Sequence, residues 1–379
     1  MLGQANYVCD AADSSLAPKA RESRVIFEDN HLFQNNLCGI RIAGDLPCII
    51  RTSDIHTNGN AGIILEKRAA ARIITSRIHK NLASGIRIGN VTNITIDKVR
   101  IFSNYKAGVS VEPEKDDGKG SSNLTITNTR IYANGQAGIR SLISPVQRLW
   151  LNVSDSQIYA NHDAGIRLQN ETILAAGNNR IYQNGSAGIL VSEDSTPAVL
   201  DIWRNHLCFN QGPGIFAVNG KGGQSGIRAN WIYGNLRSGI VLGLIKEKAK
   251  EVGRLLVTKN VIVSNGSAGK GCGVRWGGKG RVLIQRNVIA YNVSSGIRVD
   301  GCKGYSHNLL FANGKAARCC DDPYNAPFWI EIIQYGGCGT RGEGGLITDP
   351  MFVDPDAYDF HLKDGSPAMD LLYEENGLP

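Results

Sequence analysis

The sequence predicts an all-β solenoid, in which a short group of strands is repeated along the chain. The first observation is a glycine that recurs at the same position of a repeated sequence motif, here called the phrase. Gly39, Gly62, Gly85 and Gly108 are each 23 residues apart, and the longest later step is 34 residues. The second is that apolar and polar residues alternate within each phrase, which is the period of a strand. Units of this kind stack on their neighbours, so we expect one solenoid of about twelve coils.

Each coil is predicted to contain three short strands and three corners. In one coil, residues 123–127 alternate apolar and polar side chains, a second strand follows at 131–132, and a third at 139–140. Helical spacing is absent across most of the chain. Residues 245–252 are the exception, and they fall in the longest step, where we expect a loop insertion.

One corner of the coil carries an asparagine in nearly every repeat. Stacked asparagines bond to the coils above and below, and asparagine tolerates the left-handed backbone of a tight corner. We therefore expect an inward ladder of amide side chains. Its members are Asn35, Asn58, Asn81, Asn104, Asn134, Asn161, Asn184, Asn210, Asn235, Asn265, Asn292 and Asn313.

Composition sets limits on partners and location. The net charge is +7, from 41 basic and 34 acidic residues, which mildly favours an anionic partner. No dense basic arm with interleaved aromatic residues is present, so we expect no nucleic-acid binding. The longest apolar stretch is far shorter than the ~20 residues of a membrane span. The N-terminal residues lack the pattern of a signal peptide, and a chain from which a leader has been trimmed and a complete chain are both open alternatives.

The repeat also suggests how the chain is organised. Residues 1–23 are an N-terminal lead-in, residues 24–315 form the solenoid, and residues 316–379 are an irregular capping segment. An uncapped last coil would expose strand edges that promote aggregation. The apolar residues available for the cover are Phe328, Trp329, Ile330, Ile332 and Phe352.

The nine cysteines include no C-x-x-C pair, so no structural zinc site is predicted. Most of the later ones gather where the repeat breaks down. The sequence leaves two alternatives for these cysteines: they form one or two disulfides in an oxidising compartment, or they remain free thiols. These residues are Cys272, Cys302, Cys319, Cys320 and Cys338.

The phrase I-Y-x-N-x-x-A-G-I-R-I resembles the right-handed parallel β-helix repeat family, which is similar to the pectate-lyase-like superfamily and to carbohydrate-binding and sugar-hydrolase β-helix domains. The resemblance covers about residues 24–315, and residues 349–355, 359–362 and 365–370 look like the closing segment of exported bacterial β-helix proteins. It implies a single-stranded right-handed parallel β-helix. The family includes polysaccharide lyases, glycoside hydrolases, uronate epimerases and adhesins.

Two family signatures are missing from the chain. It contains no Asp-Pro-His-Asp epimerase motif, and no tight aspartate cluster that resembles a lyase calcium site. We therefore predict no cofactor and no metal site, and calcium stays open only as a family possibility.

An outward row of arginines is the first candidate for chemistry. The residue after Gly-Ile or Gly-Val points outward, and successive coils bring such side chains into line. Guanidinium groups in a row can grip carboxylates or sulfates of an anionic glycan. The alternative is that arginine only covers apolar surface with its stem. The members of the row are Arg41, Arg87, Arg140, Arg167, Arg275 and Arg298.

An outward aromatic row, including Tyr132 and Tyr159, is the second candidate. Its rings could stack on sugars, or they could form a ladder that stabilises the sheet. His162 and Asp163 make the most irregular corner of the repeat. We predict catalytic roles for His162, Asp163 and Arg167, and substrate binding by Arg140, Tyr132 and Tyr159. Further carboxylates could come from the loop residues Glu112, Glu114, Asp116 and Asp117.

Lyase chemistry needs a base and cations that stabilise an enolate-like charge, whereas a glycosidase needs two carboxylates. The sequence therefore predicts a secreted or periplasmic, monomeric carbohydrate-active protein that acts on an acidic polysaccharide by lyase or hydrolase chemistry. A non-catalytic module that binds glycans or a surface partner, and a structural rod, are the alternatives. Both alternatives share the predicted fold.

Overall fold

The computed structural model shows an all-β chain that divides into two compact units. The first unit is Met1–Arg180 with Asp194–Ala198, and the second is Ile181–Glu193 with Val199–Pro379. The structure describes residues 7–10, 24–45, 47–89, 93–112, 121–143, 148–169, 172–191, 199–218, 224–243, 254–267, 270–277, 281–299, 305–314 and 344–373.

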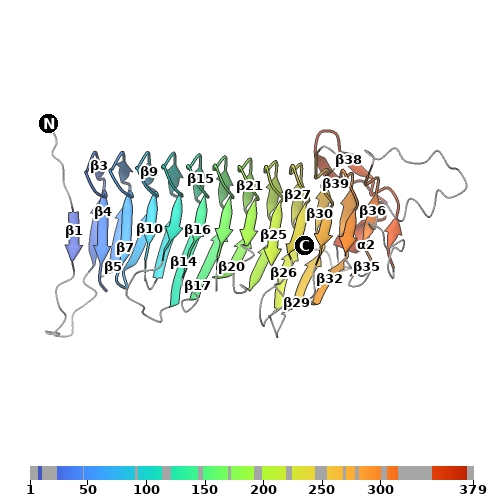
Figure 1. Ribbon diagram of the computed structural model, residues 1–379, viewed down its shortest axis with the longest axis horizontal. Helices are drawn as coiled ribbons and strands as arrows, with labels where there is room; N and C mark the ends of the chain where they lie inside the picture. The colour runs from blue at the N-terminus through green and yellow to red at the C-terminus, as the bar shows by residue number, and fades with distance from the viewer. Residues whose placement is uncertain are drawn as a thin grey trace, which may run out of the picture. The chain divides into compact units, whose positions relative to one another are not determined.

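In the first unit, successive turns of the chain add strands to three parallel sheets, A, B and C (Figure 1). Sheet A contains β1 (Tyr7–Asp10), β4 (Ile40–Ala43), β7 (Ile63–Glu66), β10 (Ile86–Ile88), β13 (Val109–Val111), β16 (Ile139–Ser141) and β19 (Ile166–Leu168). Sheet B contains β2 (Val25–Glu28), β5 (Pro47–Arg51), β8 (Ala70–Ile74), β11 (Asn93–Asp97), β14 (Ser121–Thr127), β17 (Arg148–Ser154) and β20 (Thr172–Gly177). Sheet C contains β3 (His31–Phe33), β6 (Asp54–His56), β9 (Arg77–His79), β12 (Arg100–Phe102), β15 (Arg130–Tyr132) and β18 (Gln157–Tyr159).

The second unit has the same three kinds of sheet and a small antiparallel pair. Sheet A contains β22 (Ile189–Val191), β25 (Ile215–Val218), β28 (Ile240–Gly243), β31 (Val274–Trp276) and β34 (Ile297–Val299). Sheet B contains β23 (Leu200–Trp203), β26 (Gln224–Arg228), β29 (Arg254–Thr258), β32 (Arg281–Gln285) and β35 (Tyr305–Ser306). Sheet C contains β21 (Arg180–Tyr182), β24 (His206–Cys208), β27 (Trp231–Tyr233), β30 (Val261–Val263), β33 (Val288–Ala290), β36 (Leu309–Phe311) and β37 (Leu346–Ile347). The antiparallel pair is β38 (Phe352–Asp354) with β39 (Asp359–Leu362).

Parallel pairing in a constant register confirms the predicted β-solenoid. Ile139 of β16, for example, stands beside Ile166 of β19, and both side chains are fully buried. The alternate residues Leu124 and Ile126 of β14 are also buried, as the period-two pattern predicted. The core of each unit therefore consists of inward aliphatic side chains from all three sheets.

The recurring glycine is explained by the close approach of neighbouring coils. A methyl group on Gly138 would lie 2.6 Å from Ile158 Cγ2 and 2.7 Å from the carbonyl oxygen of Gly165. Both distances are far below van der Waals contact, so a larger residue would force the coils apart. The period visible in the sequence thus marks the point where the chain packs against the next turn.

The asparagine ladder is confirmed within both units. Asn134 Nδ2 donates to Asn161 Oδ1 at 2.9 Å in the first unit, and Asn235 Nδ2 donates to Asn265 Oδ1 at 2.9 Å in the second. The left-handed backbone, however, belongs to the residue before the asparagine, such as Ala133 with φ of 53°. The asparagine side chain is instead turned inward, where it satisfies backbone groups of the buried corner.

The described part of the C-terminal segment, residues 344–373, packs on the outer face of sheet C in the second unit. Phe352 is buried as expected, and it joins Phe360 and Ala368 against Val261 and Val288. Strand β37 pairs with β36 and continues this sheet, and a short helix α2 (Met369–Leu372) follows the antiparallel pair. The other expected cover residues, Phe328, Trp329, Ile330 and Ile332, and the helical stretch 245–252 lie outside the described residues.

Within the described part of the chain, no helix is long and apolar enough to span a bilayer.

Candidate functional site

The predicted arginine pair of the first unit lies on neighbouring strands of sheet A. Arg140 of β16 is in register with Arg167 of β19. Their neighbours in each strand are buried, so the two guanidinium groups leave the same outer face. This part of the predicted patch is therefore assembled by the coil register.

Both arginines of this pair already have a partner four residues earlier, at the corner that precedes the strand. Arg167 Nη1 lies 2.7 Å from Asp163 Oδ2, and Arg140 Nη1 donates to Gln136 Oε1 at 3.0 Å. The Arg167 and Asp163 side chains are 34% and 27% exposed, which leaves them half-buried. The ion pair offsets the charge of Arg167, so this face attracts an anion less than a bare arginine pair would.

His162 is exposed at the same corner, and its backbone N–H donates to the carbonyl oxygen of Asn134 at 2.9 Å. The structure therefore brings His162, Asp163 and Arg167 together at the predicted corner. Of the expected further carboxylates, Glu112 accepts a hydrogen bond from Ser110 at 2.8 Å. Glu114, Asp116 and Asp117 lie outside the described residues.

The two tyrosines belong to a different sheet from the arginines. Tyr132 and Tyr159 lie on β15 and β18 of sheet C, and their rings stack with centroids 4.9 Å apart and planes 4° apart. Tyr132 also stacks on Phe102 of β12 at 4.9 Å and 2°. Both faces of Tyr132 are thus covered by other rings, which is the arrangement expected of a stabilising ladder. A sugar could reach only the ring edge and hydroxyl of this residue.

A cationic pocket in the second unit is the feature that sequence reasoning missed. Its volume is about 330 Å³, and it opens over the outer face of sheet A. Arg237, Lys270, Arg275 and Arg298 line it, and all four are exposed. Pro213, Phe216 and Val241 contribute an apolar wall.

The charge of this pocket is uncompensated within the described residues. None of its four cationic side chains forms an ion pair there, and its lining includes no carboxylate. Arg275 of β31 is in register with Arg298 of β34, as Arg140 is with Arg167 in the first unit. The pocket therefore presents a concentrated positive potential, which raises the local concentration of anions.

Corner residues produce this difference. Two positions after the ladder asparagine, Asn161 is followed by Asp163, whereas Asn235 is followed by Arg237 and Asn292 by Ser294. The pocket is thus lined by a cation or a hydroxyl at the position where the coils of Arg140 and Arg167 have the amide Gln136 and the acid Asp163. The outward row that the sequence revealed includes Arg275 and Arg298, whereas the most irregular corner of the repeat pointed to His162 and Asp163 in the first unit.

Lys270 reaches the pocket through an insertion in the same corner. Asn265 and Gly273 are eight residues apart, whereas Asn235 and Gly239 are four apart. Ser267 and Lys270 exchange both backbone hydrogen bonds at 2.9 Å, which closes a tight loop. Gly271 then adopts φ of 127°, a conformation that other residues rarely accept. Gly271 therefore accommodates the turn between the exposed Lys270 and the buried Cys272, both of which line the pocket.

Cys272 is a free thiol, so of the two alternatives for the late cysteines the structure supports the thiol at this position. Burial raises the pKa of the Cys272 thiol, and this outweighs the lowering effect of its hydrogen bond with Ser294 and of the nearby Arg298. A protonated thiol is a poor nucleophile. The raised pKa of Cys272 therefore argues against thiolate chemistry in this pocket. Cys302, Cys319, Cys320 and Cys338 lie outside the described residues.

Residues of metal-ligand type occur elsewhere. His31, Asp54 and His56 lie together on sheet C of the first unit, away from the corner that carries His162.

Comparison with known proteins identifies the family. The right-handed beta helix region family matches residues 19–149 and 150–245, which is more than half of the chain, so the chain belongs to this family. The resemblance predicted from the repeated phrase is therefore confirmed.

A solved structure agrees with the fold. A double mutant of the periplasmic alginate epimerase AlgG is 14% identical, with a TM-score of 0.51 over 82% of this chain and 78% of that chain. The AlgG structure without substitutions is also 14% identical over the same shares, with a TM-score of 0.46. At this identity the likeness concerns the fold alone. A search of the curated proteins gives no significant match.

Proposed function

We propose that this protein binds an acidic polysaccharide and that the cationic pocket of the second unit holds one of its carboxylate or sulfate groups. The observation that carries the proposal is the set of four exposed cations, Arg237, Lys270, Arg275 and Arg298, with no carboxylate in the lining among the described residues. Arginine forks match the planar geometry of a carboxylate and can bind it with two hydrogen bonds.

The apolar wall of the pocket favours a sugar as the molecule that bears the anionic group. Phe216 and Val241 line the pocket beside the arginines. An aromatic face suits the apolar face of a pyranose ring. The volume of about 330 Å³ is at the lower end of the range of small-molecule sites. We therefore expect one acidic sugar to be seated while the rest of the polymer continues outside.

The predicted patch of the first unit is a second contact in this proposal. Arg140 and Arg167 extend the cationic outer face of sheet A within that unit. Tyr132 and Tyr159 would contribute ring edges and hydroxyl groups rather than stacking faces.

Lyase-type cleavage is the second candidate activity, and His162 is the observation that favours it. This exposed side chain adjoins the Asp163–Arg167 ion pair. In a lyase reaction His162 would remove the proton next to the uronate carboxylate, and Arg167 would stabilise the enolate-like charge. The electron pair would then form a double bond as the neighbouring glycosidic C–O bond breaks, and the leaving oxygen would take a proton from water. Hydrolysis would need a second carboxylate in a paired geometry. Asp163 is already engaged by Arg167, so we do not propose hydrolysis.

An extracellular or periplasmic location belongs to the same proposal. AlgG, whose fold is similar, is described as a periplasmic alginate epimerase. An alginate-like polyuronate is accordingly the first substrate to test.

The test is a panel of polyuronates, sulfated glycans and neutral glycans. Binding is measured by calorimetry, and products by ultraviolet absorbance of unsaturated sugars and by a reducing-end assay. We expect binding to polyuronates and none to neutral glycans. Unsaturated products that disappear in His162→Ala would support the lyase candidate, and binding without products would leave a glycan-binding module. Equal binding to neutral glycans, or no binding at all, would contradict the proposal.

A further inference from the structure

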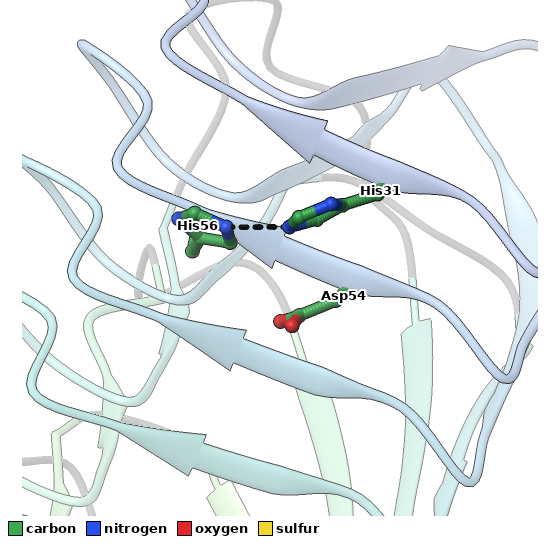
Figure 2. A group of neighbouring side chains, drawn as sticks. All are labelled: His31, Asp54 and His56. Carbon is green, nitrogen blue, oxygen red and sulfur yellow. Dashed lines mark hydrogen bonds between the residues drawn. The ribbon is translucent and has the colours of Figure 1, made fainter.

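Two histidines and an aspartate converge on the outer face of sheet C at the start of the first unit. His31 of β3 is in register with Asp54 of β6, and His56 follows Asp54 by two residues on the same face. One ligand atom from each residue lies within 4.8 Å of the others. Figure 2 shows the two imidazole rings turned toward each other, with the Asp54 carboxylate beside them. The coil register therefore brings His31 to Asp54 and His56, which lie more than 20 residues later in the sequence.

The contact between the two rings is close. His31 Nε2 and His56 Nε2 are 2.8 Å apart, so one nitrogen must donate a proton and the other must accept it. A metal ion that prefers imidazole nitrogen ligands would replace this single hydrogen bond by two coordinate bonds, one from the lone pair of each nitrogen. Zinc–nitrogen bonds of about 2.0–2.1 Å in a tetrahedral site place ligand atoms roughly 3.3 Å apart. The exposed His31 ring can open the gap by that small amount.

Partners outside the cluster already orient two of the three ligands. His56 Nδ1 lies 2.8 Å from Thr57 Oγ1. In the tautomer with the proton on Nδ1, the threonine oxygen accepts this hydrogen bond and Nε2 keeps its lone pair for an ion. Asp54 Oδ2 accepts from Arg77 at 2.5 Å, and Asp54 Oδ1 lies 3.0 Å from His79 Nε2. A carboxylate has about four lone-pair sites, so these contacts leave Asp54 able to coordinate. Such outer contacts are typical of metal-binding histidines and carboxylates.

We propose that His31, Asp54 and His56 bind a divalent transition-metal ion, with zinc as the best fit. Two imidazoles and one carboxylate suit zinc, copper or nickel, whereas calcium takes six to eight oxygen ligands. Three protein ligands leave one tetrahedral position open for water or a ligand oxygen. The site would join two successive coils, because His31 lies on β3 and the other two residues lie on β6.

The test is a titration of the full-length, chelator-treated protein with Zn²⁺, followed by calorimetry, and with Co²⁺, followed by its visible absorption. We expect one saturable Zn²⁺ site that Ca²⁺ does not occupy. The Co²⁺ spectrum should lack a thiolate charge-transfer band, which separates this site from any metal held by cysteines. Failure of the glycan-binding proposal would not affect this result, because no glycan enters the experiment.

The variant His31→Gln removes one ligand from an exposed position, so we expect the fold to persist and Zn²⁺ affinity to fall at least about tenfold. The matched control is His361→Gln, which changes an exposed histidine in the second unit and should leave affinity unchanged. Circular dichroism checks that both variants fold. No Zn²⁺ binding by the parent protein, equal affinity in His31→Gln, or a thiolate charge-transfer band in the Co²⁺ spectrum of the parent protein would overturn the assignment.

Discussion

Arg140 and Arg167 in the first unit stand at the same place in the coil as Arg275 and Arg298 in the second. Each pair is formed by register on sheet A. The first pair is bonded to Gln136 and Asp163 at the preceding corners, whereas the second faces a pocket with Arg237 and Lys270. Identical outward arginines therefore acquire opposite surroundings, and the corner residue decides which pair can receive an external anion.

The largest effect is expected from removal of the uncompensated pair. Arg275→Ala with Arg298→Ala should weaken binding of an oligouronate by about 3 kcal/mol, or roughly 100-fold, because two charge-assisted hydrogen bonds are lost. Isothermal titration calorimetry at low salt measures this loss. It should shrink as salt rises, since screening already weakens the parent contact.

The matched control removes the same charge from the other pair. Arg140→Ala with Arg167→Ala should reduce affinity only about tenfold, because Asp163 already offsets one of these charges. A larger loss here than in the second unit would reverse the comparison. Unchanged affinity in both double variants would mean that the arginines only cover the sheet.

Introducing an acidic residue at the corner of the pocket tests whether the corner residue controls anion binding. Arg237→Asp gives the second unit the residue type that Asp163 supplies in the first. We expect affinity to fall by about 2 kcal/mol, roughly 30-fold, because an attraction is replaced by a repulsion. The same titration with Arg237→Gln, which removes the charge without reversing it, should show an intermediate loss. Equal losses in the two variants would argue against an electrostatic role for this corner.

The smallest effect is expected when Arg167 of the first unit loses its ion-pair partner Asp163. Asp163→Asn removes the carboxylate that binds Arg167, and a half-exposed ion pair of this kind is worth only about 0.2–1 kcal/mol. We expect an approximately threefold gain in oligouronate affinity, with a small loss of thermal stability. A decrease in affinity would indicate that Asp163 contacts the ligand or orients Arg167 for it.

The fold could be predicted because its physical constraints recur at visible positions. Gly138 is required where two coils approach within the space of a methyl group, and Asn134 is required where a buried corner needs its amide. Such requirements repeat in every turn and therefore leave a period in the sequence. The C-terminal segment shows no period, because Phe352 packs once, on one face of one sheet.

The sites could be predicted only in part, because they depend on side-chain direction and on register between coils. The outward arginine row in the sequence includes Arg275. That Lys270 lies in the same pocket is visible only in the structure, because a corner insertion that ends at Gly271 places it there. The tyrosine row was visible as well, whereas the stacking of Tyr132 on both faces depends on its rotamer. His31 and Asp54 meet because the coil length aligns them, a signal that a search for local spacing does not detect.

A crystal structure of the protein with a bound oligouronate tests the central claim most directly. The account predicts a sugar carboxylate within hydrogen-bond distance of the Arg275 and Arg298 guanidinium groups, with the sugar ring against Phe216 and Val241. A carboxylate bound at Arg140 and Arg167 instead, with the pocket of the second unit empty, would contradict it.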